Sequence, residues 1–97
     1  MTENDNAQLH ATVEGRVQGV SFRYFVAEQA TLLGITGWVR NRWNGNVEVT
    51  AEGSRSQLEC LLVALNKGPR AARVTKVTHQ WGEATGAFSS FRIGMTA

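Results

Sequence analysis

Apolar and polar residues alternate along several short segments of this chain, and a period of two is typical of strands that bury one face. The first such segment spans residues 9–14, where polar residues separate Leu9, Ala11 and Val13. The same pattern, bounded by turn-forming residues, predicts further strands at residues 35–43, 46–52, 73–81 and 88–93.

Between the first two strands the pattern changes to the period of a helix. Apolar residues recur on one helical face from Phe22 to Leu33, and Gly34 marks the end of the segment. Ser21 stands directly before it. We expect the Ser21 hydroxyl to cap this helix by accepting a hydrogen bond from a free N–H group.

The second half of the chain carries signals for a hairpin and a second helix. Asn44 and Gly45 suit the positive φ angles of a two-residue hairpin turn. A helix is predicted to open at Ser54, where Gln57 completes a capping box, and to end at Gly68. Its buried face is a stripe of leucines.

The order of these elements is β-α-β-β-α-β followed by a short extra strand, which predicts an α+β fold of the ferredoxin-like kind. In this sandwich an antiparallel sheet carries two helices on one face. A chain of 97 residues is the size of one domain. We expect residues 1–7 to be frayed or disordered and residues 8–97 to form a single domain.

The charge, the apolar runs and the cysteine count argue against several classes of function. The formal net charge is +2 and the lysines and arginines are scattered, so we expect no nucleic-acid surface. No long apolar run or signal-like start is present, and Cys60 is the single cysteine. We therefore expect a cytoplasmic protein with no membrane partner, no metal and no disulfide. His10 and His79 are separate residues in strands, without metal-ligand spacing.

The loop between the first strand and the first helix carries the candidate chemistry. Glycines at 15 and 19 allow a tight bend before a helix N-terminus, where backbone N–H groups and the helix dipole can bind a phosphate. Arg23, in the first helical turn, can add a planar fork of donors. The alternative from these residues alone is a plain turn followed by a solvated arginine. Neither the ATP-binding nor the dinucleotide-binding glycine pattern is present.

Two longer motifs are present, G-R-V-Q-G-V-x-F-R, unbroken at residues 15–23, and G-W-V-x-N at residues 37–41. Together they resemble the signatures of the acylphosphatase family. The resemblance extends over residues 9–93. It implies the ferredoxin-like fold, no cofactor, and hydrolysis of the carboxyl-phosphate bond of acyl phosphates.

The resemblance also implies roles for individual residues. Arg23 would bind the phosphoryl group and Asn41 would orient the attacking water. Backbone N–H groups of the loop would complete the phosphate site: Val17, Gln18, Gly19, Val20, Ser21 and Phe22. Water would attack in line, without a covalent phosphoenzyme, and inorganic phosphate would compete as a product. We expect a monomer.

Two other functions share this fold. An RNA-binding module would carry aromatic residues on a central strand, and residues 46–53 contain none. A sensor domain would bind a phosphorylated effector without hydrolysing it. Glu14, Glu48 and Glu52 have no pairing that marks an acid and a base, and we interpret them as surface charges.

Overall fold

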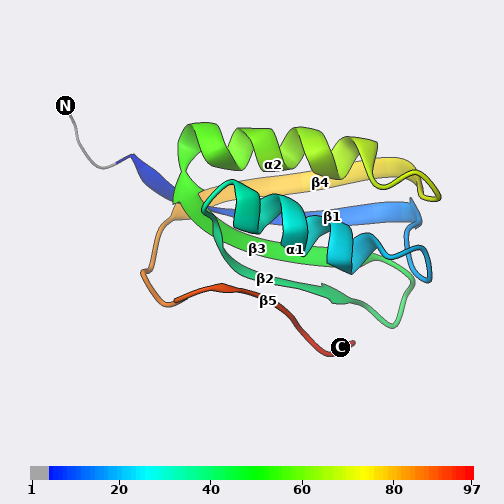
Figure 1. The fold of residues 1–97 in the computed structure, drawn as a ribbon. Coiled ribbons are helices and arrows are strands. Elements are labelled where there is room, and N and C mark those ends of the chain that lie inside the picture. Colours follow the sequence, from blue (N-terminus) through cyan, green and yellow to red (C-terminus); the bar gives the residue numbers. More distant parts are fainter. Residues whose placement is uncertain (1–4) are drawn as a thin grey trace.

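The computed structural model describes residues 5–97, which form one sheet covered on one face by two helices (Figure 1). The elements are β1 (Asn6–Arg16), α1 (Phe22–Leu32), β2 (Thr36–Asn41), β3 (Val47–Ser54), α2 (Arg55–Lys67), β4 (Arg73–Glu83) and β5 (Phe91–Ile93). Of the N-terminal segment expected to be frayed, residues 1–4 lie outside the described residues, and β1 already begins at Asn6.

The sheet has the strand order β4-β1-β3-β2-β5, which is the predicted ferredoxin-like arrangement with one added edge strand. β1 pairs antiparallel with β3 and β4, and β2 pairs antiparallel with β3. The expectation of a purely antiparallel sheet is wrong in one detail, because β5 pairs parallel with β2. The connection after β4 crosses to the far edge before β5 begins, so β5 runs in the same direction as β2 (Figure 1).

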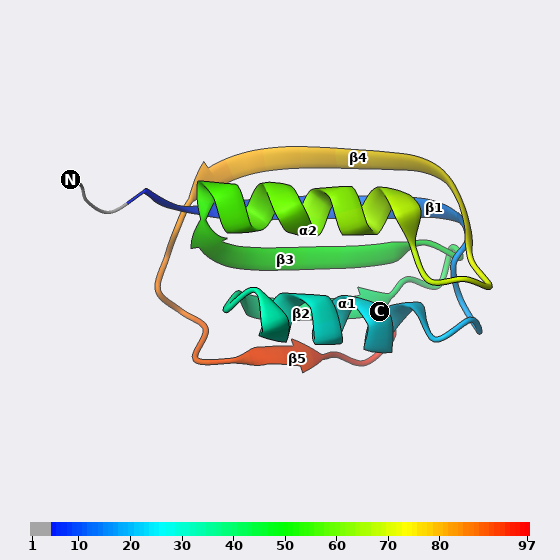
Figure 2. The same cartoon turned by 45° about the horizontal axis from the view of Figure 1, so that its top comes forward.

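One face of the sheet and the inner faces of the helices form the core. Seen from the helical side, α1 and α2 lie next to each other over the strands (Figure 2). The fully buried side chains come from alternate positions of the inner strands and from helical stripes, and include Leu9, Ala11, Val13, Val39, Val47, Val49, Ala51, Val26, Ala30, Leu58, Leu61 and Leu65. Burying one such large aliphatic side chain contributes about 1.5–3 kcal/mol, and a shift of one residue would expose the whole row.

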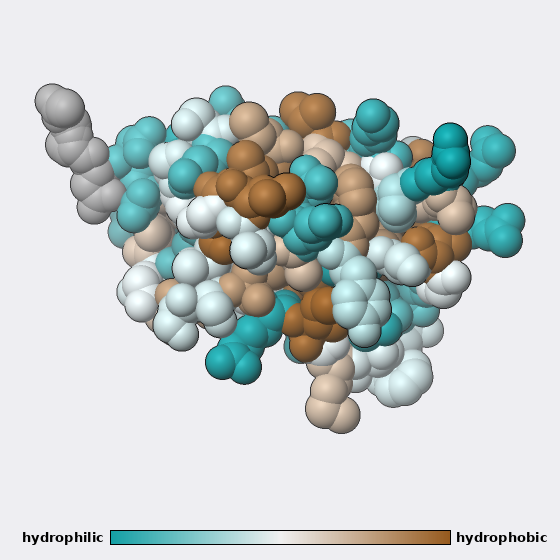
Figure 3. Space-filling view, viewed as in Figure 1, coloured by the Kyte–Doolittle hydropathy of each residue, from teal (hydrophilic) through white to brown (hydrophobic). Residues whose placement is uncertain are grey.

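The outer face of the helices carries both hydrophobic and hydrophilic side chains. In the view of Figure 3, hydrophobic side chains lie among hydrophilic ones and do not gather in one area. Leu32 on α1 and Val63 on α2 are among the exposed apolar residues. Such scattered apolar residues are ordinary on a protein surface.

The two helix starts differ from each other. The predicted capping box of α2 is confirmed, with the Gln57 N–H donating to Ser54 Oγ and the Ser54 N–H donating to Gln57 Oε1. The predicted Ser21 cap is wrong, because Ser21 makes no side-chain cap bond. Its φ of 62° and ψ of 26° place it in the left-handed region, whereas a capping side chain requires an extended backbone.

The β2–β3 hairpin is also longer than expected. The Arg42 N–H donates to the Asn46 carbonyl at 2.8 Å, which leaves three residues in the loop, so the predicted two-residue turn is wrong. The Gly45 N–H donates to the Arg42 carbonyl at 3.1 Å, and Gly45 takes a φ of 98°. A turn followed by one glycine of positive φ is the common form of a three-residue hairpin loop.

Candidate active site

The fold brings the two sequence motifs to the same end of the sheet. Both β1 and β2 run antiparallel to β3, so they run parallel to each other. In the register of the sheet, Val13 pairs with Val47 and Val47 pairs with Asn41. The chain leaves β1 three residues after Val13 and enters the loop at residues 17–21, at the end of the sheet where Asn41 closes β2 (Figure 1).

A direct contact joins the loop to the hairpin that follows Asn41. The side-chain amide nitrogen of Gln18 donates to the carbonyl of Arg42 at 2.7 Å and to the carbonyl of Asn46 at 2.9 Å. Both acceptors belong to the turn between β2 and β3. The predicted phosphate loop and the predicted water-binding residue are therefore held in one structural unit.

The backbone of the loop leaves its donors free within the protein. Across residues 5–97, no N–H group of residues 17–22 donates a hydrogen bond to another residue. Gly19 has a φ of 74°, and Ser21 is the one non-glycine residue of the described chain with a positive φ. A non-glycine residue in this conformation costs about 1–2 kcal/mol, and such strain is found mainly at functional sites. A bend of free N–H groups before a helix is suited to an anion.

Arg23 differs from the other half-buried arginines of residues 5–97. Arg40 Nε donates to Glu48 Oε1 at 2.9 Å, and Arg42 Nη1 donates to the same oxygen at 3.2 Å. Arg23 is half-buried in the first turn of α1 and makes no ion pair or hydrogen bond with any residue that the structure describes. Its guanidinium keeps its full set of donors for a ligand.

Asn41 also has an unused polar atom. Its Oδ1 is buried and, within the described residues, is the single buried side-chain oxygen or nitrogen without a hydrogen-bond partner. Its backbone carbonyl accepts a bond from the Ala97 N–H at 3.1 Å, which fixes the end of β2. A buried acceptor left unpaired costs about 1–3 kcal/mol, so a free carboxamide oxygen at this position indicates a functional role.

The interpretation of Glu48 as a plain surface charge is wrong, because the carboxylate is at the centre of an ionic cluster. Glu48 Oε2 lies 2.7 Å from His10 Nε2, and the other oxygen accepts from both neighbouring arginines. Burial raises the pKa of Glu48, but the bonds from His10 and Arg40 outweigh burial and lower that pKa below its usual value. The cluster lies on the sheet face away from the helices, because Val47 and Val49 on either side point into the core.

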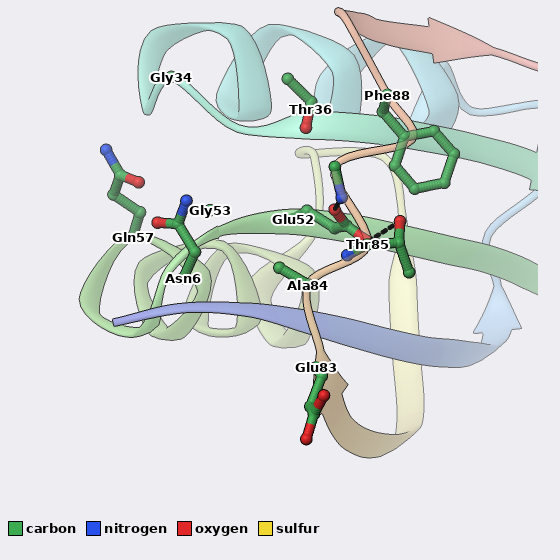
Figure 4. A pocket seen from close by; sticks show the side chains of 11 residues that line it. Asn6, Gly34, Thr36, Glu52, Gly53, Gln57, Glu83, Ala84, Thr85 and Phe88 are labelled. Carbon is green, nitrogen blue, oxygen red and sulfur yellow. Dashed lines mark hydrogen bonds between the residues drawn. The ribbon is translucent and has the colours of Figure 1, made fainter. Parts of the chain in front are cut away.

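A cavity of about 670 Å³ lies at the other end of the sheet and contains none of the predicted site residues. Glu52, Glu83, Thr85 and Phe88 are among its lining residues (Figure 4). Glu52 is only 5% exposed, so the prediction that it is a surface charge is wrong. Thr85 and Gly86 arrive from the β4–β5 connection, far away in sequence, and the sequence pattern gives no signal for this contact.

Membrane-spanning helices and metal-binding clusters are the next features to consider in the structure. In the part of the chain that the structure describes, no helix is long and apolar enough to cross a membrane, and no group of three or more His, Cys, Asp or Glu side chains could hold a metal ion. Cys60 is exposed on α2. Arg16 is exposed at the end of β1 and faces Arg73 of β4 in the register.

Comparison with known proteins decides the family. The family model described as acylphosphatase matches residues 9–93. The chain belongs to the acylphosphatase family. An acylphosphatase of Salinibacter ruber is 44% identical over 93 residues, which cover 96% of this chain and 98% of the relative. The family resemblance inferred from the two motifs is thereby confirmed, and with it the enzyme class, a hydrolase of acyl phosphates.

Solved acylphosphatase structures agree with the fold. The crystal structure of the acylphosphatase from Bacillus subtilis matches with a TM-score of 0.88 and 36% identity, covering 91% of this chain and 98% of that chain. The acylphosphatase from Coxiella burnetii matches with a TM-score of 0.83 and 40% identity, covering 93% and 94%. The α+β sandwich is thus the architecture of other acylphosphatases.

Proposed function

We propose that this acylphosphatase binds the phosphoryl group of its substrate at residues 17–23 and directs water onto phosphorus from Asn41. The backbone N–H groups of residues 17–22 and the Arg23 guanidinium form the phosphate site. Asn41 is the water-orienting residue. The observation that carries this assignment is the meeting, at one end of the sheet, of free N–H groups, an unpaired half-buried arginine and a buried unpaired carboxamide oxygen.

The binding step requires donors that match a tetrahedral dianion. Backbone N–H groups at a helix N-terminus point toward one place and carry partial positive charge. The Arg23 fork can donate two parallel hydrogen bonds to phosphoryl oxygens. Arg40 and Arg42 are paired with Glu48, whereas Arg23 remains available for the phosphate.

The chemical step needs little from the protein beyond position and charge. The water oxygen forms a bond to phosphorus, and the bond from phosphorus to the acyl oxygen breaks, with its electron pair leaving on the carboxylate. The proton released from water passes to a phosphoryl oxygen, so the products are a carboxylate and inorganic phosphate. The Asn41 carboxamide hydrogen-bonds the attacking water and orients its lone pair toward phosphorus. It does not take the proton, because a carboxamide is not a base.

In this scheme no side chain becomes phosphorylated. Ser21 stands in the loop, but no histidine or lysine activates it by a hydrogen bond in residues 5–97. Inorganic phosphate leaves from the site in which the phosphoryl group was held, so it inhibits competitively. The cytoplasmic location and the monomeric state remain predictions.

Hydrolysis of benzoyl phosphate in the presence of EDTA tests the proposal. The wild-type protein should release phosphate, and Arg23→Lys should lose most of this activity because the ammonium cannot form the bidentate contact. Arg92→Lys is the matched control, because Arg92 is exposed on β5. Binding of benzoyl phosphate without release would indicate a sensor, and equal activity of Arg23→Lys and Arg92→Lys would refute the phosphate site.

A further inference from the structure

Gln18 joins the two halves of the proposed active site through its side chain. We propose that Gln18 is a positioning residue, whose carboxamide sets the separation between the phosphate loop and Asn41. The inference rests on the proposed function, because it assumes that the loop holds phosphate and that Asn41 orients water. It adds a role that the backbone N–H group of Gln18 does not supply.

The geometry of the contact is specific. Gln18 Nε2 lies 2.7 Å from the Arg42 carbonyl oxygen and 2.9 Å from the Asn46 carbonyl oxygen. These two residues are themselves paired, since the Arg42 N–H donates to the Asn46 carbonyl. One amide therefore bonds to both ends of the hairpin turn. Two bonds from one nitrogen fix the direction of the side chain as well as its distance.

Packing anchors the loop to the core, because Val17 is buried and Val20 packs beside it, but the polar contacts between the loop and the hairpin are few. In the described chain, the hydrogen bonds from residues 17–21 to the β2–β3 turn are those of the Gln18 side chain. Beyond them, the loop backbone takes part in one bond, in which the Ser21 carbonyl accepts from the Phe25 N–H of α1. Gly19 follows Gln18 directly at a φ of 74° and brings no side chain that could restrain the bend.

The contact also explains why Gln18 acts through other groups. A carboxamide nitrogen has two hydrogens, and both are directed to hairpin carbonyls. Neither remains for the substrate. Arg42 directly follows Asn41, so a shift of its carbonyl moves the end of β2 and the water held there. Hydrolysis depends on the alignment of water with phosphorus, and a misplacement of about 1 Å can cost on the order of 100-fold in rate.

Gln18→Met tests the role without adding a charge. The methionine side chain is similar in length and has no N–H donor. The loop should therefore keep its backbone N–H groups and Arg23 but lose its fixed position relative to Asn41. We expect kcat for benzoyl phosphate to fall by about tenfold or more, while the inhibition constant of inorganic phosphate stays within about threefold of wild type. Gln80→Met is the control, because Gln80 is exposed on β4.

A second variant guards against loss of folding. In Gln18→Glu the carboxylate has no donor and faces two carbonyl oxygens, which raise its pKa above the usual value of about 4.3. The protonated form has one donor, so kcat relative to wild type should recover in part as pH falls from neutral toward acid. An unchanged kcat in both variants, or a parallel rise of the phosphate inhibition constant with the loss of kcat in Gln18→Met, would overturn the inference. If the wild type itself failed to release phosphate, the proposed function would fail instead.

Discussion

The Thr85 hydroxyl donates a 2.8 Å hydrogen bond to Glu52 Oε2, joining the β4–β5 connection to the end of β3. The same oxygen accepts from Gln8 Nε2 at 2.7 Å and from the Thr85 N–H at 3.0 Å. The Gly86 N–H donates to the other oxygen at 3.0 Å. Glu52 is therefore a buried anion bound by neutral donors, and it holds the connection that delivers β5 to the edge of the sheet (Figure 4).

Replacing Glu52 by glutamine should destabilise the fold. The new amide keeps the size of the side chain but presents an NH₂ group where backbone N–H donors point. We expect the free energy of unfolding to fall by about 1–3 kcal/mol, measured by urea denaturation. Glu83→Gln is the control, because Glu83 lines the same cavity but is exposed. Equal stability of the two variants would show that the Glu52 contacts contribute nothing.

The same contact predicts a pH dependence. Burial raises the pKa of Glu52, but the hydrogen bonds from Gln8, Thr85 and Gly86 outweigh burial and hold that pKa below its usual value. The stabilisation is present above the pKa of an unfolded glutamate, about 4.3, and is lost as pH falls through the lower pKa of the folded state. The stability difference between wild type and Glu52→Gln should thus be largest near neutral pH and shrink in acid. A difference that grew on acidification would contradict this sign.

Gly37 opens the second motif for a structural reason. Its φ is 136°, and an added Cβ would lie 2.0 Å from the Thr50 carbonyl oxygen on β3. Gly37→Ala should lower the free energy of unfolding by at least about 2 kcal/mol, through backbone strain and a clash that the sheet cannot relieve. Gly82→Ala should change stability by less than about 0.5 kcal/mol, since nothing lies within 4 Å of its added Cβ. Comparable thermal unfolding of the two variants would refute the steric account.

At Ser21, where the backbone is left-handed, we expect a substitution to glycine to be tolerated better than one to alanine. Ser21→Gly should be more stable than Ser21→Ala by about 1 kcal/mol, because only glycine adopts this φ without strain. In the middle of α1 the order should reverse, with Ala27→Gly less stable than wild type by about 0.5–1 kcal/mol. Denaturant unfolding of the four proteins gives both differences. If alanine and glycine were equally stable at position 21, the loop would not hold this conformation in solution.

Asn41→Ala should separate attack from binding. Removal of the carboxamide leaves the phosphate loop and Arg23 in place but removes the group that orients water. We expect turnover of benzoyl phosphate to fall by about 100-fold or more. Asn66→Ala, on the exposed side of α2, is the control and should retain normal turnover. Strong residual hydrolysis by Asn41→Ala would exclude Asn41 from the water-orienting role.

Local patterns predicted most of the fold because its core follows them. The alternating residues Leu9, Ala11 and Val13 are fully buried. Of the predicted leucine stripe of α2, three members are fully buried and Leu62 is partly buried. The capping box at Ser54 is a contact within three residues and was predicted correctly. The Ser21 cap was not, because the bend before α1 imposes its own backbone angles.

The contacts that the sequence could not predict join distant segments. Glu48 gains its partner His10 from 38 residues away, and Glu52 gains Thr85 from 33 residues away. Gln18 was expected to contribute a backbone N–H group, whereas its side chain bonds to the hairpin 24 and 28 residues away. Hydropathy periods carry no information on such polar pairs, since any polar residue fits an outward position. The two motifs indicated Arg23 and Asn41, and their roles stay predictions until measured.

Titration of inorganic phosphate into wild type, Arg23→Lys and Asn41→Ala by calorimetry tests the central claim most directly. Arg23→Lys should bind phosphate at least about tenfold more weakly, because the bidentate contact is lost. Asn41→Ala should bind it within about twofold of wild type, because its carboxamide serves the water and not the phosphate. Wild-type affinity in Arg23→Lys, or an equal loss in both variants, would contradict the assignment of binding to the loop and Arg23 and of attack to Asn41.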